Sequence, residues 1–428
     1  MSFYAGIDFG TSGARLAIVN AAAELCYEAS IPFGTVAESD LAACWQETLF
    51  ALLQTVDRTE RKNLAAIAIN GTSATVLLCD AVGQPLTPPL LYNDSCGAAE
   101  VETLRQLFAQ KEYMNAPCRH TVLSATSSLV KLLWWSRQAT FSHAKYLLHQ
   151  ADWLAFLLHG QPGISDYHNS LKLGYDVVEC RYPAWLTALA IAPLLPQVVA
   201  PGTSIGRVQP DVATQLDLPP DCWVCAGTTD SIAAFLASGA AEPGEAVTSL
   251  GSTLVLKLLS QVPVENQAYG IYSHRLGDRW LVGGASNTGG AVLQQFFTPA
   301  DLARLSDRIP TDQISPLTYY PLTQPGERFP VNDPNLSPCL EPRPDDPVAF
   351  LHGLLESMAR IEAEGYRLLQ TLGATPLSRV YTAGGGAQNA AWTALRQRHL
   401  GVTVERSQQP EAAYGTALLA LRSSIQPT

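Results

Sequence analysis

The chain has 428 residues, of which 47% are hydrophobic and 15% are charged, and its formal net charge is −11. This balance excludes a disordered or fibrous chain, and the length suits two large domains. The negative charge and the lack of any basic run exclude counterion-driven binding of nucleic acid.

The apolar segments and the cysteines predict a cytoplasmic protein without membrane spans. The most apolar stretch, residues 186–200, is interrupted by Pro193 and Pro196 and falls short of the ~18 apolar residues that a span needs. Asp8 precedes Arg15, the first basic residue, which is the reverse of a signal peptide's order. Nine cysteines, an odd number, predict reduced thiols. We expect no membrane partner, and a monomer or a homodimer.

The first predicted element is a β-hairpin over residues 4–20. Two apolar runs meet at Gly10-Thr11-Ser12-Gly13, which has the composition of a hairpin turn. Such a turn exposes N–H groups and hydroxyls that suit phosphate oxygens, although turns favour the same residues for backbone reasons alone. Asp8 lies in the apolar strand before the turn, where a buried carboxylate requires a cation or donors. A hydrated Mg²⁺ beside bound phosphates would meet that requirement.

A helix, a buried strand and a second helix follow. Apolar residues recur at helical spacing over residues 41–55 and 123–135. Between them, residues 64–70 form an apolar run that ends at Gly71-Thr72-Ser73. In the second helix, Lys131, Trp134 and Trp135 could line a ligand pocket, but we interpret them as a helix face packed in the core.

Residues 224–239 predict a strand, a Gly-Thr-Thr turn and an Ala-rich helix that Asp230 opens. Asp230 could cap this helix. A carboxylate there could equally accept a proton from a substrate hydroxyl in phosphoryl transfer. Cys222 and Cys225 have a Cys-x-x-Cys spacing, but we interpret them as part of the buried strand because no second Cys or His pair stands nearby.

The second half of the chain repeats the design of the first. Residues 244–260 predict another hairpin, with its turn at Gly251-Ser252-Thr253, and residues 379–383 predict another strand that ends at Gly384-Gly385-Gly386. The connection between these two elements is longer than in the first half. We place the insertion at residues 309–347, whose Pro and Asp content predicts long surface loops.

Helical periodicity marks two further segments of the second half, residues 348–372 and 411–421. Strands mixed with such helices predict the α/β class.

Seven segments, in the right order along nearly the whole chain, resemble motifs of the FGGY carbohydrate kinases, whose superfamily includes actin, hexokinase and the heat-shock chaperone ATPases. They are similar to a first phosphate motif, a Trp-Asn-Asp segment, the catalytic-base element, a second phosphate motif, a glycine segment of the nucleotide cleft, the adenosine motif and a closing helix. In that order they are residues 8–12 with Arg15, 91–94, 226–230, 249–253, 284–290, 384–389 and 411–417.

The resemblance implies an α/β fold of two actin-like (ribonuclease H-like) ATPase domains with a central nucleotide cleft. We expect an N-terminal domain over residues 1–240, on the side of the sugar and the first phosphate motif. A C-terminal domain over residues 241–428 would hold the nucleotide, and its last helix could pack back on the first domain. The resemblance implies ATP or ADP and Mg²⁺ as cofactors and a small-molecule sugar as partner.

The resemblance also implies roles for single residues. Asp230 inherits the role of catalytic base, Asp8 is expected to hold Mg²⁺, and the sugar is expected against Asp8, Ser73, Asp94 and Asp230. Closure of the domains would exclude water, so that sugar rather than water is phosphorylated. The residues expected to bind the nucleotide are Thr11, Ser12, Arg15, Gly251, Ser252, Thr253, Gly289, Gly290, Gly384, Gly385 and Asn389.

Departures from the family's patterns narrow the expected substrate. Glycerol kinases place an Arg-Glu pair where this chain has Thr72-Ser73, and bacterial xylulokinases carry Met-His where it has Ser73-Ala74. The length is similar to that of the compact pentulose kinases of cyanobacteria and plants. We therefore expect phosphorylation of the terminal hydroxyl of a pentulose, D-ribulose ahead of D-xylulose.

Two other functions use the same superfamily fold. A chaperone-like or actin-like ATPase would act as an interaction module without a sugar, but no peptide-binding or polymerising segment is visible. A sugar-sensing regulator would need a helix-turn-helix before the first phosphate motif, and Asp8 lies too close to Met1 for one. We therefore favour the kinase.

Overall fold

The computed structural model describes residues 2–114 and 116–423, and the chain divides into two compact units. Unit 1 comprises residues 1–237 and 411–428, and unit 2 comprises residues 238–410. The sequence-based division assigned the last helix to the second domain but allowed it to pack back on the first, and the contacts of residues 411–423 group them with unit 1.

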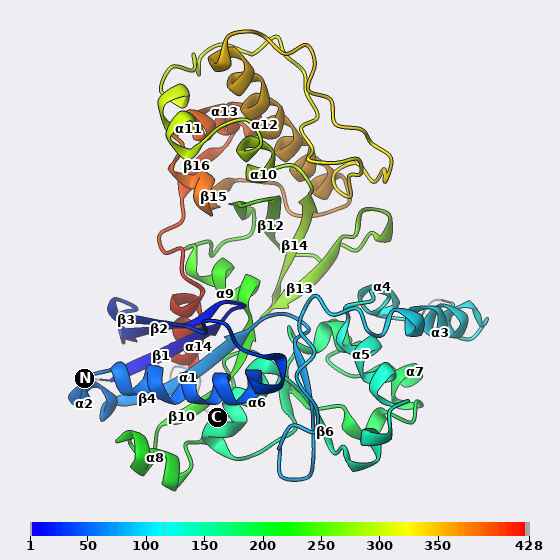
Figure 1. Cartoon of the computed structure of the whole chain (residues 1–428), viewed down its shortest axis with the longest axis vertical. Coiled ribbons are helices and arrows are strands. Elements are labelled where there is room, and N and C mark those ends of the chain that lie inside the picture. Colours follow the sequence, from blue (N-terminus) through cyan, green and yellow to red (C-terminus); the bar gives the residue numbers. More distant parts are fainter. Residues whose placement is uncertain (1, 115, 424–428) are drawn as a thin grey trace. The chain divides into compact units, whose positions relative to one another are not determined.

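A six-stranded sheet forms the centre of unit 1 (Figure 1). Its first hairpin is antiparallel, whereas β1 and β4 pair in parallel, as do β4 and β10. In spatial order the strands are β3 (Leu25–Pro32), β2 (Gly13–Asn20), β1 (Phe3–Phe9), β4 (Leu64–Gly71), β10 (Trp223–Thr229) and β9 (Ser204–Arg207).

Helices cover both faces of this sheet. Side chains alternate between the faces along a strand, so Ile7 and Phe9 of β1 join the apolar core beneath α1 and α6. Gly6 and Asp8 point to the opposite face, where a Cβ at Gly6 would meet the backbone of α14. The helices that pack on the sheet are α1 (Leu41–Thr55), α6 (Gln150–His159), α8 (Pro210–Leu216), α9 (Asp230–Ala237) and α14 (Ala412–Ser423), with α2 (Arg58–Arg61) beside them.

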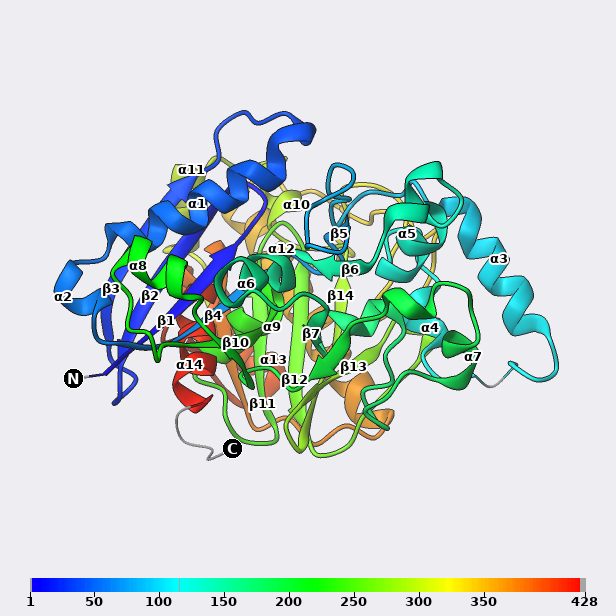
Figure 2. The same cartoon turned by 90° about the horizontal axis from the view of Figure 1, so that it is seen from below.

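A second part of unit 1 gathers beside this sheet around an apolar cluster of its own (Figure 2). The helix predicted over residues 123–135 begins only at Ser128, because Ser127 caps it by accepting a hydrogen bond from Val130 N at 3.3 Å. The elements of this part are α3 (Ala98–Ala109), α4 (Arg119–Val122), α5 (Ser128–Trp135) and α7 (Ala184–Thr187), with the strand pairs β5 (Val76–Cys79) with β6 (Tyr146–His149) and β7 (Ile164–Asp166) with β8 (Gln197–Val199).

Unit 2 has a sheet of the same design. The antiparallel hairpin β11/β12 corresponds to β1/β2, and β15 pairs in parallel with β11 as β4 does with β1. In spatial order the strands are β13 (Tyr272–Leu276), β14 (Arg279–Ser286), β12 (Leu254–Ser260), β11 (Glu245–Leu250), β15 (Arg379–Ala383) and β16 (Thr403–Arg406). The helices are α10 (Gly290–Gln294), α11 (Pro299–Ser306), α12 (Pro347–Thr371) and α13 (Ala390–Leu400).

The connection between α11 and α12 contains no helix or strand among its described residues, as predicted for an insertion. It is not only a surface loop, however. Phe329 is 1% exposed, and its ring occupies the space that a Cβ at Gly284 or Gly365 would need. Part of the insertion therefore completes the core of unit 2 between β14 and α12.

The described helices include no candidate for a membrane span, because none is both long enough and apolar enough. Even α12, with 25 residues, carries several charged side chains along its length.

Candidate active site

Two carboxylates of unit 1 lie close enough to influence each other. Asp8 lies near the end of β1, and Asp230 opens α9 directly after β10. Asp8 is 5% exposed, and among the described residues its Oδ1 has no hydrogen-bond partner. Burial and then the negative charge of Asp230 raise the pKa of Asp8 to about 6, while Arg15 opposes the rise. This edge of the sheet therefore concentrates negative charge where water is largely excluded.

The pair fits a divalent cation that keeps most of its water ligands. Hard cations such as Mg²⁺ are bound through one or two carboxylates together with substrate phosphates. The described residues contain no group of three or more His, Cys, Asp or Glu side chains that could hold a metal. Asp8 can therefore contribute to a magnesium site that substrate phosphates complete, but the chain supplies no closed cage.

The first hairpin turn lies beside this pair. Gly10 N donates to Gly13 O at 3.0 Å and closes the turn, which leaves Thr11 and Ser12 exposed. Arg15 on β2 reaches back with Nη1 3.7 Å from Asp8 Oδ2 and Nε 3.3 Å from the carboxylate of Glu411. The predicted residues Thr11, Ser12 and Arg15 are thus brought together with Asp8.

Asn70 and Thr416 are polar residues of this site that the sequence reasoning missed. Asn70 pairs with Asp8 in the register of β1 and β4, is fully buried, and donates from Nδ2 to Thr416 Oγ1 at 2.6 Å. A polar residue at the end of the apolar run over residues 64–70 was a signal for Asn70. No local signal placed Thr416 there, because α14 comes from the far end of the chain.

The segment after β4 is only partly available to a ligand. Thr72 is 8% exposed, its Oγ1 lies 2.5 Å from Thr75 Oγ1, and it also donates to Gln150 Oε1. Its hydroxyl is therefore taken up by hydrogen bonds inside the protein and is not available to a sugar. Ser73 is half-buried and is the better candidate for contact with a substrate.

Asp94 lies at a pocket of about 540 Å³ in unit 1. Its carboxylate accepts a hydrogen bond from Leu91 N. Trp134 and Trp135 line the same pocket, although Trp135 and Lys131 are also buried. The interpretation as a core-facing helix face is confirmed for the buried Trp135 and Lys131, whereas Trp134 is half-buried and also lines the pocket. Asp8, Ser73 and Asp230 do not line this pocket.

Unit 2 contains a pocket of about 630 Å³ that gathers five of the eleven predicted nucleotide residues. Three separate segments meet there: the turn after β11, the start of α10 and the segment between β15 and α13. One wall of the pocket is α11, whose Ser306 Oγ accepts a hydrogen bond from Asn389 Nδ2 at 2.8 Å. The predicted residues that line the pocket are Gly251, Ser252, Gly290, Gly385 and Asn389.

The glycines of this pocket are required by close backbone approach. Gly290 N donates to Gly251 O at 2.8 Å, and a Cβ at Gly290 would lie 2.7 Å from that oxygen. Gly384 has a φ of +83°, and its Cβ would lie 2.7 Å from Leu250 O. Gly289 packs equally closely on Thr253. The predicted residues Thr253, Gly289 and Gly384 therefore lie behind the pocket and shape its wall.

Comparison with known proteins adds to this geometry. Residues 3–237 match the N-terminal domain of the FGGY family of carbohydrate kinases, and residues 246–424 match its C-terminal domain. The chain belongs to the FGGY family of carbohydrate kinases.

Several relatives of this kinase span nearly its whole length. It is 28% identical to the xylulose kinase of Streptomyces coelicolor over 98% of this chain and 86% of that protein. It is 21% identical to the xylulose kinase of Staphylococcus xylosus, over 98% of this chain and 90% of that one. A gluconokinase of Bacillus subtilis is 23% identical over 68% of this chain and 59% of its own.

Solved structures share the two-domain α/β fold. A xyloylose kinase from Brucella ovis superposes with a TM-score of 0.86 at 23% identity, covering 100% of this chain and 91% of that one. The glycerol kinase of Plasmodium falciparum, solved with ADP, gives a TM-score of 0.84 at 15% identity, with coverage of 100% and 91%.

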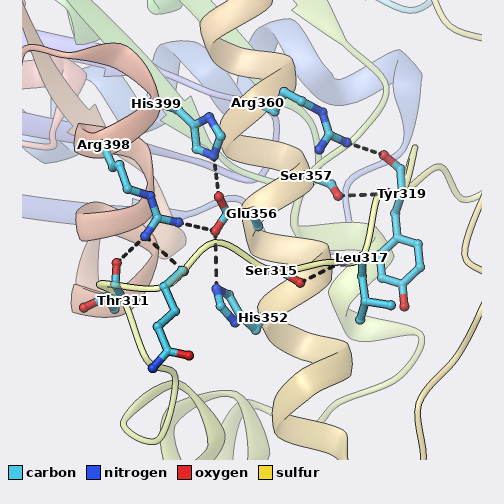
Figure 3. A network of polar contacts seen from close by, with 11 residues as sticks. Thr311, Ser315, Leu317, Tyr319, His352, Glu356, Ser357, Arg360, Arg398 and His399 are labelled. Carbon is cyan, nitrogen blue, oxygen red and sulfur yellow. Dashed lines mark hydrogen bonds and ion pairs between the residues drawn. The ribbon is translucent and has the colours of Figure 1, made fainter.

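A polar cluster centred on the buried Glu356 joins α12 to the end of α13 in unit 2 (Figure 3). Glu356 of α12 accepts hydrogen bonds from Arg398 and His399 at the end of α13. Burial raises the pKa of Glu356, but these two partners outweigh it and hold that pKa below its usual range. Arg398 also donates to Thr311 O and Gln313 O in the chain that follows α11. One carboxylate thus ties α12 to α13 and, through Arg398, to the chain that follows α11.

Proposed function

We propose that this kinase transfers the terminal phosphate of ATP to the terminal hydroxyl of a pentulose. The observation that carries the proposal is the pair Asp8 and Asp230. Both are held at one edge of the sheet of unit 1, and the charge of Asp230 acts on the buried carboxylate of Asp8. Phosphoryl transfer needs a carboxylate to accept the hydroxyl proton and a second carboxylate near the metal, and this pair supplies both.

In this proposal Asp230 accepts the proton of the sugar hydroxyl. Its place at the start of α9 leaves it partly accessible, and Ser231 N donates to its Oδ1 at 2.6 Å, which fixes one oxygen and directs the carboxylate. Asp8 holds Mg²⁺, which neutralises phosphate charge when bound. Ser73 and Asp94 bind sugar hydroxyls, because a site built on hydrogen bonds discriminates against substrates that leave them unpaired.

ATP is proposed to bind unit 2, with its adenosine in the pocket beside Gly385 and Asn389 and its phosphates at the turn of Ser252. The pocket volume of about 630 Å³ lies in the range typical of small-molecule sites. In unit 1, the exposed Thr11 and Ser12 with Arg15 offer further donors for phosphate oxygens.

The choice of pentulose rests on the segment after β4. Ser73-Ala74 lacks the Met-His pair associated with bacterial xylulokinases, although full-length relatives are named xylulose kinases. We keep D-ribulose as the first expected substrate and D-xylulose as the alternative.

The test is a panel of D-ribulose, D-xylulose, L-ribulose, glycerol and gluconate, assayed by ADP release at fixed ATP. D-ribulose is expected to give the highest kcat/KM. A highest kcat/KM for D-xylulose would change the expected sugar but keep the proposal of a pentulose substrate. A highest kcat/KM for glycerol or gluconate would overturn that proposal. If no polyol raised turnover above the rate with ATP alone, the transfer reaction itself would be rejected.

A further inference from the structure

Lys131 is a buried cation that the reaction proposed above does not use. It lies on α5 with 0% of its side chain exposed, and lysine is almost never fully buried without partners. Its Nζ donates to two backbone carbonyls, Ala74 O at 2.8 Å and Leu91 O. The ammonium group therefore holds two separate stretches of backbone.

Those two stretches carry the proposed sugar contacts. Ala74 directly follows Ser73. Leu91 is joined to Asp94 in both directions, because Asp94 N donates to Leu91 O at 3.0 Å and Leu91 N donates to the Asp94 carboxylate. Hydrogen bonds thus run without a break from Lys131 through Leu91 to the Asp94 side chain.

The backbone at Ala74 needs such support. Its φ is +65°, in the left-handed region that residues other than glycine rarely adopt. A residue held there persists only where its surroundings determine its conformation. Thr75 N donates to Thr72 O at 3.2 Å across this turn, and Lys131 fixes the carbonyl of Ala74 from the other side.

The charges around Lys131 couple it to the same segment. Burial lowers the pKa of Lys131 to about 8, while Asp94 and Cys96 oppose the fall and Lys172 adds to it. The ammonium is therefore charged below pH 8 and loses its attraction for the Asp94 carboxylate as the pH rises through that value.

We propose that Lys131 is a positioning residue that fixes Ser73 and Asp94 relative to each other and thereby sets the affinity for the sugar. The proposal rests on the proposed function, since it takes these two residues as sugar contacts. It assigns Lys131 no contact with the substrate, and it gives the enzyme a sugar KM that depends on one internal ammonium group.

The first experiment compares Lys131→Met with Lys145→Met, which removes an exposed lysine of the same unit. Lys131→Met is expected to raise the sugar KM about 10- to 100-fold, because small misplacements of binding groups cost factors of this size. The KM for ATP should stay within twofold, which shows that the variant is folded. Lys145→Met should leave both constants unchanged. An unchanged sugar KM in folded Lys131→Met would overturn the proposal.

The pH profile of the sugar KM separates positioning from general stability. In the wild type the KM should rise as the pH passes 8. Lys131→Arg keeps its charge at every accessible pH, so it should restore part of the affinity and flatten the rise. A wild-type KM that is constant from pH 7 to 9.5 would contradict the role of the charge.

Hydrogen exchange tests the same idea without any substrate. In Lys131→Met, backbone amides of residues 72–76 and 90–95 should exchange about tenfold faster than in Lys145→Met, because one hydrogen bond of typical strength is lost at each end. Equal exchange would reject the positioning role even if no sugar supports turnover in the wild type. Faster exchange in a protein without sugar turnover would instead reject the proposed function and keep the coupling of the two segments.

Discussion

The two hairpins that open the two halves have the same topology and different chemistry. In unit 1, β1 carries Asp8 before its turn. In unit 2, β11 carries Ser249 at the corresponding place, before the turn at Gly251. The neighbouring parallel strands differ in the same way. Asn70 of β4 reaches α14, whereas Thr382 of β15 accepts a hydrogen bond from Arg396, which forms a buried ion pair with Glu362.

This difference teaches how one scaffold can serve two tasks. In unit 1 the carboxylate of Asp8 is buried, and among the described residues its Oδ1 has no hydrogen-bond partner. Burying an unpaired charge is costly, so a bound cation would stabilise this carboxylate. In unit 2 the buried charges satisfy each other, and the site is a pocket lined largely by backbone and small side chains. We infer that the first hairpin supplies a reactive carboxylate, whereas the second hairpin shapes the pocket proposed for the nucleotide.

The largest expected effect concerns the carboxylate chemistry of unit 1. Asp230→Asn should lower kcat about 10²- to 10⁴-fold, because the general base is lost while the side chain keeps its size. ATP binding, measured by calorimetry, should be unchanged because the pocket proposed for the nucleotide lies in unit 2. A variant that kept more than half of the wild-type kcat would show that Asp230 is not the general base. The proposed difference between a reactive unit 1 and a pocket-forming unit 2 would then fail.

Asp8→Asn tests whether the buried charge of Asp8 destabilises the protein when no cation is bound. Folding raises the pKa of Asp8 from 3.8 to about 6, so the folded protein loses stability as the pH rises between these values. Without metal at pH 7 to 8, the variant should be more stable than the wild type by up to about 3 kcal/mol at 1.36 kcal/mol per pKa unit. Denaturant unfolding measures the gain, which should shrink toward pH 4.

The change in Tm on addition of Mg²⁺ tests whether Asp8 contributes to a metal site. Mg²⁺ with ATP should raise the Tm of the wild type more than that of the variant, because a ligand stabilises only the state that binds it. Equal shifts in the two proteins would mean that Asp8 does not face the metal.

The smallest expected effect concerns the shape of the pocket proposed for the nucleotide. Gly384→Ala should raise the KM for ATP about tenfold, since a φ of +83° and a Cβ 2.7 Å from Leu250 O together cost about 1–3 kcal/mol. Gly401→Ala is the matched control, because Gly401 also has a positive φ but open space around its Cβ. The control should lose a little stability and keep its KM for ATP. Equal changes in the KM for ATP in the two variants would mean that backbone strain, and not the contact of the Cβ with Leu250 O, causes the effect.

Much of the fold could be predicted from local patterns. The helix predicted over residues 41–55 has those bounds, and the strands at residues 64–70 and 379–383 lie within one residue of β4 and β15. The two glycine-rich hairpin turns and the duplication are also found as predicted. These features depend on periodicity and turn composition, which are properties of consecutive residues.

Other features could not be read in this way. The helix predicted over residues 123–135 starts only at Ser128, because the capping hydrogen bond of Ser127 fixes its first turn there although the apolar periodicity begins earlier. The hydroxyl of Thr72 is bonded to Thr75 and Gln150, and Gln150 lies far away in the sequence, so the sequence alone does not show which hydroxyls after β4 are free for a ligand.

The sequence by itself determined the α/β class, the two related halves and the residue types of the candidate site, because strand period, helix period and turn composition are local. Only the tertiary structure decided that Thr416 of α14 meets Asn70, that Trp134 and Trp135 line a pocket with Asp94, and that Lys131 joins two loops. These facts depend on contacts between residues far apart in the chain, where burial and hydrogen-bond satisfaction choose among arrangements that local patterns leave equal.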